Sequence, residues 1–186
     1  MGVDESNNGS YPTIFVGVQT SDPTLLERHA VQKELDQINQ GKTSLDFLKG
    51  HRLKKIRDIG EICEKMASTR FRYVSITRGQ EALFGYQLMR AIAIHELASA
   101  FGGIDAVLID GIPNPGIVEL LGVIGNRPLC IDGIPLGDER YPVVNLADMI
   151  AYGIFMTFKR CKDYACPSRM IIPRMKKYSP YLNETA

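Results

Sequence analysis

The sequence predicts an α/β fold in which a mixed sheet carries helices on both faces. Residues 106–110 form a continuous apolar run that ends in Asp110 and Gly111, and such runs are typical of strands that helices cover on both faces. Residues 12–20 and 71–76 are rich in β-branched and aromatic side chains, which favour strands. Helical stretches separate these segments. The order is therefore two or three strands, helices, and then strand, helix, strand, helix.

The N-terminal third has a local signal for each element. Residues 3–5 and 12–20 flank a polar turn at 7–10, so we expect a hairpin with a short first strand. The Asp-Pro pair at 22–23 is an N-cap followed by proline, which predicts a helix over about 23–39. A second helix follows over 45–69.

The next helix begins at a capping signal. Thr77 and Gln80 have capping-box spacing, which predicts a long helix to about residue 100, and the glycines at 102–103 end it. His95 lies among apolar residues of this helix. A single histidine in such a place is expected to be a partly buried, hydrogen-bonded residue rather than a ligand.

The C-terminal half continues the alternation of helices and strands. Residues 116–125 predict a short helix, and 128–131 predict a strand that Asp132 closes. Residues 137–142 have turn chemistry, because Pro142 disfavours a helical conformation of the residue before it. The helix over 143–158 is apolar on all sides, as expected for a helix packed inside a domain.

Composition and charge set limits on the function. The chain has 186 residues, 45% of them hydrophobic, and a net charge of +1, so we expect one domain that is not basic throughout. Its 4 cysteines have no paired spacing, which is typical of reduced thiols in a cytoplasmic protein. We predict neither a signal peptide nor a membrane span. The oligomeric state is left open.

Basic residues gather in two stretches, at 49–57 and at 159–177, and tyrosines are interleaved with the second. Such runs are usually solvated faces, but phosphate-binding surfaces are built from them. We therefore predict nucleic acid as the partner. We divide the chain into a domain over 1–160 and a basic extension at 161–186, which is either packed on that domain or partly flexible. The candidate contacts are Lys49, Arg52, Lys54, Lys55, Arg140, Lys159 and Arg160.

The acids that end the predicted strands carry the chemistry. Each is by itself an ordinary turn residue, but together they suggest a site for two divalent cations, because Mg²⁺ and Mn²⁺ prefer carboxylate and phosphate oxygens. A lone carboxylate within an apolar helix must be hydrogen-bonded, protonated, at the rim of the core or bound to a cation. The candidate catalytic and metal-binding residues are Asp4, Glu5, Asp110, Asp138 and, in that helix, Asp148.

Three short motifs resemble type 2 ribonuclease H. Residues 3–6 (Val-Asp-Glu-Ser) are similar to the I-D-E-A start of that family, and residues 108–111 (Leu-Ile-Asp-Gly) are similar to its V-D-G strand. Residues 137–151, which begin Gly-Asp-Glu-Arg-Tyr-Pro, resemble its G-D-A-K-Y-P segment. The resemblance implies a ribonuclease H-like fold, with the family's four metal-binding carboxylates at Asp4, Glu5, Asp110 and Asp138. Uncharacterised ribonuclease H-like domains, including an archaeal family, share the Asp-Glu-Ser start and the pattern around Asp148.

The chain also departs from the type 2 pattern. The G-R-G segment with which that family grips the RNA–DNA junction is replaced by residues 7–9 (Asn-Asn-Gly), Asp148 replaces a serine, and Tyr152 replaces a lysine. The resemblance therefore supports the metal site more than the junction specificity.

We predict a Mg²⁺- or Mn²⁺-dependent nuclease that hydrolyses RNA, RNA–DNA hybrid or DNA through a two-metal carboxylate site. The alternative is a binding protein with an incomplete site, which holds nucleic acid or a protein partner. A small-molecule enzyme is disfavoured, because the sequence has no glycine-rich phosphate loop and no nucleophile motif.

Overall fold

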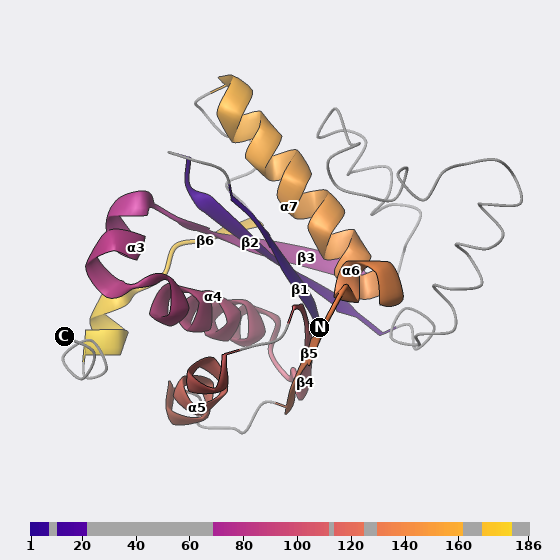
Figure 1. Ribbon diagram of the computed structural model, residues 1–186, viewed down its shortest axis with the longest axis horizontal. Coiled ribbons are helices and arrows are strands. Elements are labelled where there is room, and N and C mark those ends of the chain that lie inside the picture. The colour runs from indigo at the N-terminus through magenta and orange to yellow at the C-terminus, as the bar shows by residue number, and fades with distance from the viewer. Residues whose placement is uncertain (8–10, 22–68, 112–113, 125–129, 162–168, 180–186) are drawn as a thin grey trace, which may run out of the picture.

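A mixed sheet runs through the centre of the protein (Figure 1). The computed structural model describes residues 1–7, 11–21, 69–111, 114–124, 130–161 and 169–179. In this part of the chain, the sheet has six strands in the order β5-β4-β1-β2-β3-β6. Their bounds are β1 (Gly2–Ser6), β2 (Thr13–Thr20), β3 (Thr69–Ile76), β4 (Ala106–Asp110), β5 (Cys130–Ile134) and β6 (Met170–Ile171).

The strand directions follow from the connections. β1, β2 and β3 are successive antiparallel neighbours, as expected for the predicted hairpin. β4 is parallel to β1 and β5 is parallel to β4, because each is reached through a helical connection. The strand predicted over 128–131 ends too early. β5 continues through Asp132 and Gly133 to Ile134, because β4 pairs with those residues as well.

The helices are α3 (Arg78–Phe84), α4 (Tyr86–Phe101), α5 (Pro115–Ile124), α6 (Gly137–Arg140) and α7 (Pro142–Cys161), with the 3₁₀ helix η5 (Met175–Tyr178). The capping box at Thr77 and Gln80 is confirmed. The single long helix predicted after it is wrong, because Gly85 has φ 79° and separates α3 from α4. The turn predicted at 137–142 contains the short helix α6. The helices predicted over 23–39 and 45–69 lie outside the described residues, except for Thr69, which is the first residue of β3 rather than helical. None of the described helices is long and apolar enough to cross a bilayer.

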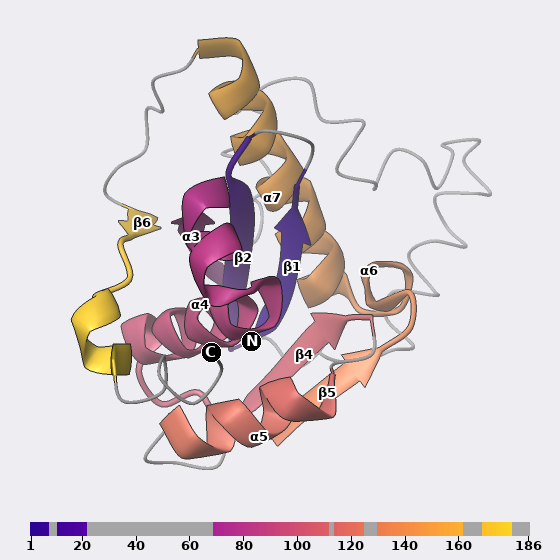
Figure 2. The ribbon, with the colours of Figure 1, turned by 60° about the vertical axis from the view of Figure 1, so that its left-hand side comes forward.

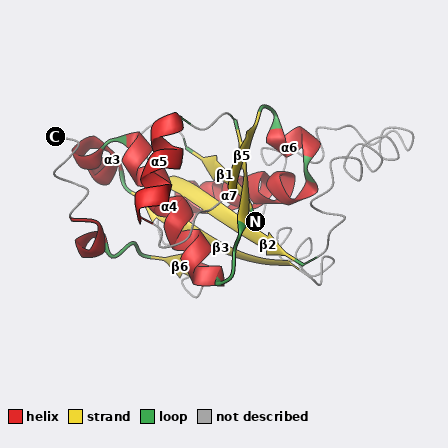
Figure 3. Ribbon diagram, turned by 90° about the horizontal axis from the view of Figure 1, so that it is seen from below, coloured by secondary structure: helices red, strands yellow, loops and turns green. Residues whose placement is uncertain are grey.

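Helices cover both faces of the sheet, as predicted. Figures 2 and 3 show α4 and α5 on one side of the strands and α7 on the other. Odd-numbered residues of β1 and β4, such as Val3 and Ile109, pack with α4, whereas Leu108 packs with α7. Because side chains alternate along a strand, Asp4 and Asp110 belong to the α7 face and Glu5 belongs to the α4 face.

Gly2 lets α7 approach β1 closely. A Cβ built at Gly2 would lie 2.5 Å from the carbonyl oxygen of Val143, near the start of α7. We predict that Gly2→Ala lowers the free energy of unfolding by about 1–3 kcal/mol or more, because backbone must move to make room. Gly122→Ala is the matched control, since a Cβ at this helical position meets nothing within 4 Å. It should raise stability by roughly 0.5–1 kcal/mol. Equal losses for the two variants in urea unfolding would contradict this.

The segment after α7 returns to the sheet. β6 pairs with β3, and the buried Tyr178 packs in the core beneath α4. The Tyr178 hydroxyl lies 2.9 Å from Nδ1 of His95 and donates to Glu96 at 2.6 Å. Burial lowers the pKa of His95, and the nearby Lys177 lowers it further. His95 is therefore the half-buried, hydrogen-bonded histidine expected from the sequence. The division of the chain at residue 160 stays a prediction.

Candidate active site

Asp4 and Asp110 lie on two neighbouring parallel strands. Asp110 ends β4, whereas β1 continues past Asp4 to Ser6, and Asp4 comes directly after the last residue of β1 that pairs with β4. Val3 of β1 is in register with Ile109 of β4, so Asp4 and Asp110 are the next residues on the two strands. Neighbouring strands lie about 4.8 Å apart, and both acids belong to the α7 face. The two carboxyl groups therefore come from adjacent positions at the carboxyl edge of the sheet, where ligands of α/β proteins collect.

Asp4 is buried among other acids. Only 8% of the residue is exposed, and its Oδ1 accepts a hydrogen bond from the Glu5 amide at 2.7 Å. Burial raises the pKa of the Asp4 carboxyl well above its usual range, and the negative charges of Asp148, Asp110 and Glu5 raise it further, although the amide hydrogen bond opposes this. These four acids form the acidic cluster. Its charges repel one another, and a bound cation would relieve that repulsion.

Asp110 is fixed by the start of α6. Its Oδ1 accepts a hydrogen bond from the Gly137 amide at 2.6 Å. A Cβ at Gly137 would lie 3.2 Å from the Asp110 Cα, so glycine is what lets α6 come so near to the strand. Leu136, just before it, has φ 56° and ψ 45°, a left-handed conformation that costs a non-glycine residue about 1–2 kcal/mol. The turn into α6 thus orients the Asp110 carboxylate at the cost of backbone strain.

The other two predicted acids on this side come from α6 and α7. Asp148 is half-buried on α7 and close enough to Asp4 to raise its pKa. This corresponds to the rim position among the alternatives given for a carboxylate in an apolar helix. Asp138 is half-buried at the second position of α6, directly after the glycine that binds Asp110. Both acids therefore lie on the elements that flank the Asp4–Asp110 edge.

Glu5 faces the opposite side of the sheet. The Tyr86 hydroxyl donates a hydrogen bond to its Oε1, and Nε of Arg90 lies 3.4 Å from its Oε2. Burial, together with the Glu5 charge, raises the pKa of the Tyr86 hydroxyl. Sequence reasoning missed Tyr86 and Arg90. The available signal was their i, i+4 spacing, which puts the two side chains on one face of α4.

The donor set suits a divalent cation that shares its coordination with a substrate. Within the described ranges, no three His, Cys, Asp or Glu side chains are close enough together to hold a metal ion. Mg²⁺, however, commonly takes only one or two protein carboxylates and completes its shell with water and phosphate oxygens. Asp4 and Asp110 supply two carboxylates, and the pKa of Asp4 is raised first by burial and then by the negative charges of the neighbouring acids. The residues present therefore fit Mg²⁺ or Mn²⁺.

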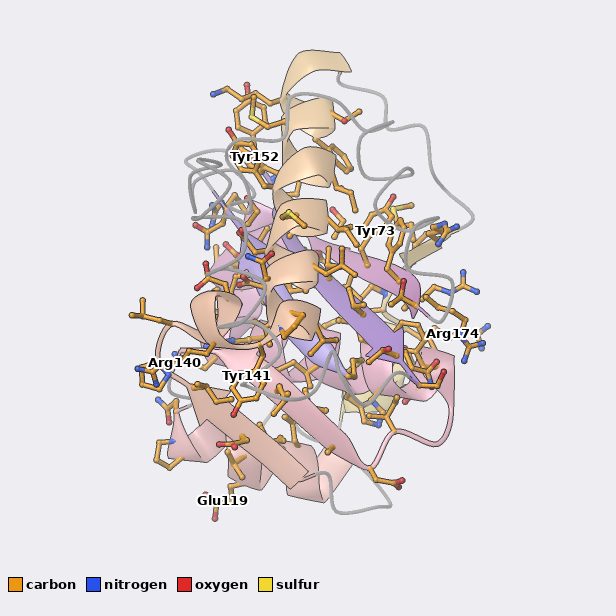
Figure 4. All side chains as sticks on the ribbon, turned by 90° about the vertical axis from the view of Figure 1, so that its right-hand side faces the viewer. Tyr73, Glu119, Arg140, Tyr141, Tyr152 and Arg174 are labelled. Atoms are coloured by element: carbon orange, nitrogen blue, oxygen red, sulfur yellow. The ribbon has the colours of Figure 1, made fainter. Side chains whose placement is uncertain are left out.

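The structure describes the backbone of three of the predicted nucleic-acid contacts, on α6 and α7. Lys49, Arg52, Lys54 and Lys55 lie outside the described residues. Arg140 is half-buried on α6, Lys159 is exposed near the end of α7, and Arg160 belongs to the last turn of α7. Figure 4 shows Arg140 and Arg174 on opposite sides of α7. Arg140 and Lys159 lie at opposite ends of the 20-residue helix α7, so these two described residues do not form one patch.

Comparison with known proteins gives structural relatives. No protein-family model matches the chain, and no curated protein matches it. The chain is similar to RNase HII from Archaeoglobus fulgidus, solved in complex with PCNA, with a TM-score of 0.56 and 19% identity over 87% of this chain and 74% of that one. It is similar to ribonuclease H2 from Pyrococcus horikoshii OT3, with a TM-score of 0.53 and 13% identity over 98% and 84%.

A third relative is Bst-RNase HIII, solved in complex with Mn²⁺. Its TM-score is 0.52 and its identity 16%, and the alignment covers 83% of this chain but 51% of that one. This chain thus spans about half the length of that protein. The likeness of all three lies in the arrangement of strands and helices rather than in the sequence. The chain has a ribonuclease H-like fold.

Proposed function

We propose that this protein is a Mg²⁺- or Mn²⁺-dependent nuclease that hydrolyses phosphodiester bonds of RNA, RNA–DNA hybrid or DNA. The observation that carries the proposal is the Asp4 carboxyl, which lies beside Asp110 where β1 and β4 cease to pair and whose pKa is raised by burial and then by the acids around it. Such a cluster is costly for stability. A metal-binding role accounts for that cost, and the ribonuclease H-like fold agrees with it.

The side chains divide into two roles. Asp4 and Asp110 would hold a cation. Asp138 as a further ligand and a second ion stay part of the proposal, although no three such side chains among the described residues lie close enough to share one ion. Bound divalent cations supply an activated water and neutralise charge on the reacting phosphate. Asp148 is our candidate for orienting that water, because it is half-buried beside Asp4 and retains access to solvent. Glu5 was predicted as a ligand, and its contacts to Tyr86 and Arg90 suggest another role, which is considered below.

A cleavage assay tests the proposal. Nicked duplex, hybrid, and single-stranded RNA and DNA would be incubated with the protein and Mg²⁺, Mn²⁺ or a chelator. We expect cleavage of at least one substrate with a metal and none with the chelator. Binding of these substrates without cleavage under any metal condition would reject the nuclease.

Binding should depend on salt. Exposed basic side chains lie near the end of α7 at Lys159, directly before β6 at Arg169 and after β6 at Arg174, and the 49–57 run adds more charge. If about four phosphates are neutralised, affinity should fall roughly 100-fold between about 50 and 200 mM salt. Changing Lys49, Arg52, Lys54 and Lys55 together to glutamine should flatten this slope, whereas the exposed Asp105→Asn should not. An affinity that is insensitive to salt would contradict phosphate binding.

A nucleic-acid-binding protein without catalysis is the second candidate. The specific observation in its favour is that Glu5 is engaged on the α4 face, which leaves fewer carboxylates beside Asp4 than the family pattern implies. Divalent-metal binding distinguishes the two candidates: a nuclease must bind Mn²⁺ at Asp4 and Asp110, whereas the binding protein need not.

A further inference from the structure

Arg90 contacts the ends of two neighbouring strands at once. Its Nε lies 3.4 Å from Glu5 Oε2 on β1, and its terminal nitrogen donates to the main-chain carbonyl of Asp110 on β4 at 3.2 Å. The part of α4 that carries Arg90 is held in the core, because the adjacent Met89 and Ala91 are fully buried. The planar guanidinium fork can make both contacts from one side-chain position. Arg90 therefore connects the two strands through Glu5 and Asp110, which both belong to the acidic cluster.

Glu5 and Arg90 depend on each other. Their side chains are 20% and 11% exposed. Among the described residues, the Glu5 Oε2 and Arg90 Nε atoms are buried and have no hydrogen-bond partner, so the ion pair between them is the interaction that compensates these two atoms. Removing one member leaves the other as a buried, unpaired charge, which is more damaging than removing both.

Glu5 is also turned away from the predicted metal. Tyr86 engages one carboxylate oxygen and Arg90 faces the other, both from α4. Asp4 and Asp110 belong to the opposite face of the sheet. A carboxylate that Tyr86 and Arg90 contact on the α4 face is directed away from an ion held on the α7 face.

From these contacts we propose that Glu5 and Arg90 are a positioning pair and that Glu5 is not a metal ligand. Arg90 holds the end of β1 through Glu5 and the end of β4 through the Asp110 carbonyl, and so sets the spacing of the Asp4 and Asp110 carboxylates. The pair acts through these two acids and does not touch the reacting atoms. The inference rests on the proposed metal-dependent nuclease.

Mn²⁺ affinity separates a ligand from a positioning residue. Free Mn²⁺ would be measured by electron paramagnetic resonance during titration of wild-type protein, Glu5→Gln and Asp4→Asn. We expect Glu5→Gln to bind Mn²⁺ within about threefold of wild type and Asp4→Asn to lose at least tenfold, about 1.4 kcal/mol. Equal losses for the two variants would overturn the proposal and restore Glu5 as a ligand.

Kinetics test the positioning role. The double variant Glu5→Gln with Arg90→Gln keeps the net charge and removes the connection. Its kcat should fall about tenfold or more while KM for the nucleic acid stays within about twofold, as for a loss that acts on the transition state alone. The single variant Arg90→Lys, which keeps the positive charge beside Glu5, should have a kcat between those of the double variant and the wild type. Arg78→Gln is the matched control, because Arg78 pairs with Glu81 instead. Unchanged kcat in the double variant would overturn the positioning role.

A double-mutant cycle of melting temperatures tests the Glu5–Arg90 pair even if the nuclease proposal fails. Wild-type protein that neither binds Mn²⁺ nor cleaves would reject the proposed function. The melting temperatures of Glu5→Gln, Arg90→Gln and the double variant still measure the pair. A double variant that loses less than the sum of the single losses supports the pairing, and additive losses overturn it.

Discussion

Asp110→Asn is expected to abolish metal-dependent cleavage while the protein stays folded. The change removes one negative charge from the Asp4–Asp110 edge, so a divalent cation binds less tightly and the developing charge on the phosphate is less well stabilised. Loss of one such electrostatic group typically lowers kcat on the order of 10²- to 10³-fold. The amide retains an oxygen that can accept the hydrogen bond from Gly137, which is made at 2.6 Å in the wild type.

Two acids of the same type serve as controls for this variant. Asp105 precedes β4 and Asp132 lies within β5, and both are exposed. Asp105→Asn and Asp132→Asn should cleave at the wild-type rate, with circular dichroism showing that all three variants are folded. Cleavage by Asp110→Asn at the wild-type rate would mean that the site has been assigned to the wrong residues.

Asp4→Asn is expected to raise the stability of the metal-free protein at neutral pH. The folded-state pKa of Asp4 is raised, first by burial and then by Asp148, Asp110 and Glu5. The folded protein therefore binds the Asp4 proton more tightly than the unfolded chain does. By linkage, this group's contribution to stability is full below its unfolded pKa of about 4 and is lost as pH rises through the folded pKa. Asparagine does not titrate, so Asp4→Asn does not lose stability in this way as the pH rises.

The gain should therefore depend on pH. With a chelator present, the melting temperature of Asp4→Asn should exceed that of wild type by several degrees near neutral pH, since about 1 kcal/mol corresponds to roughly 2–4 °C at this size. The difference should shrink as the pH approaches about 4. Mn²⁺ should raise the melting temperature of wild type but not of the variant, because an ion stabilises only a state that binds it. A lower melting temperature for Asp4→Asn at neutral pH would contradict the buried, repelled carboxyl.

Much of the fold could be predicted because its signals are local. The apolar run at 106–110 is β4, the β-branched stretch at 12–20 is β2, and the capping box at Thr77 begins α3. The break at Gly85 was missed, because a glycine within an apolar helix is often tolerated and only the positive φ shows the interruption. The short helix α6 was missed because its sequence, Gly-Asp-Glu-Arg, consists of residue types that are also common in turns.

The candidate site was predictable in part for a similar reason. Acids that end parallel strands reach the same edge, so Asp4 and Asp110 could be placed together from the sequence. Asp148 could be singled out by its apolar surroundings. The sequence did not reveal that Glu5 faces α4, because that depends on the strand's phase relative to the two helix layers. Arg90 was missed because its contacts join residues that are 85 and 20 positions away in the chain.

The most direct test is an anomalous difference map from crystals soaked in Mn²⁺. We predict a Mn²⁺ peak at the carboxyl edge of β1 and β4, within about 2.2 Å of carboxylate oxygens of both Asp4 and Asp110, as expected for oxygen ligands of such ions. Crystals of Asp110→Asn should lack that peak under the same conditions. A wild-type map with no Mn²⁺ at these two acids, at a concentration that saturates binding in solution, would contradict a metal centre at this edge of the sheet.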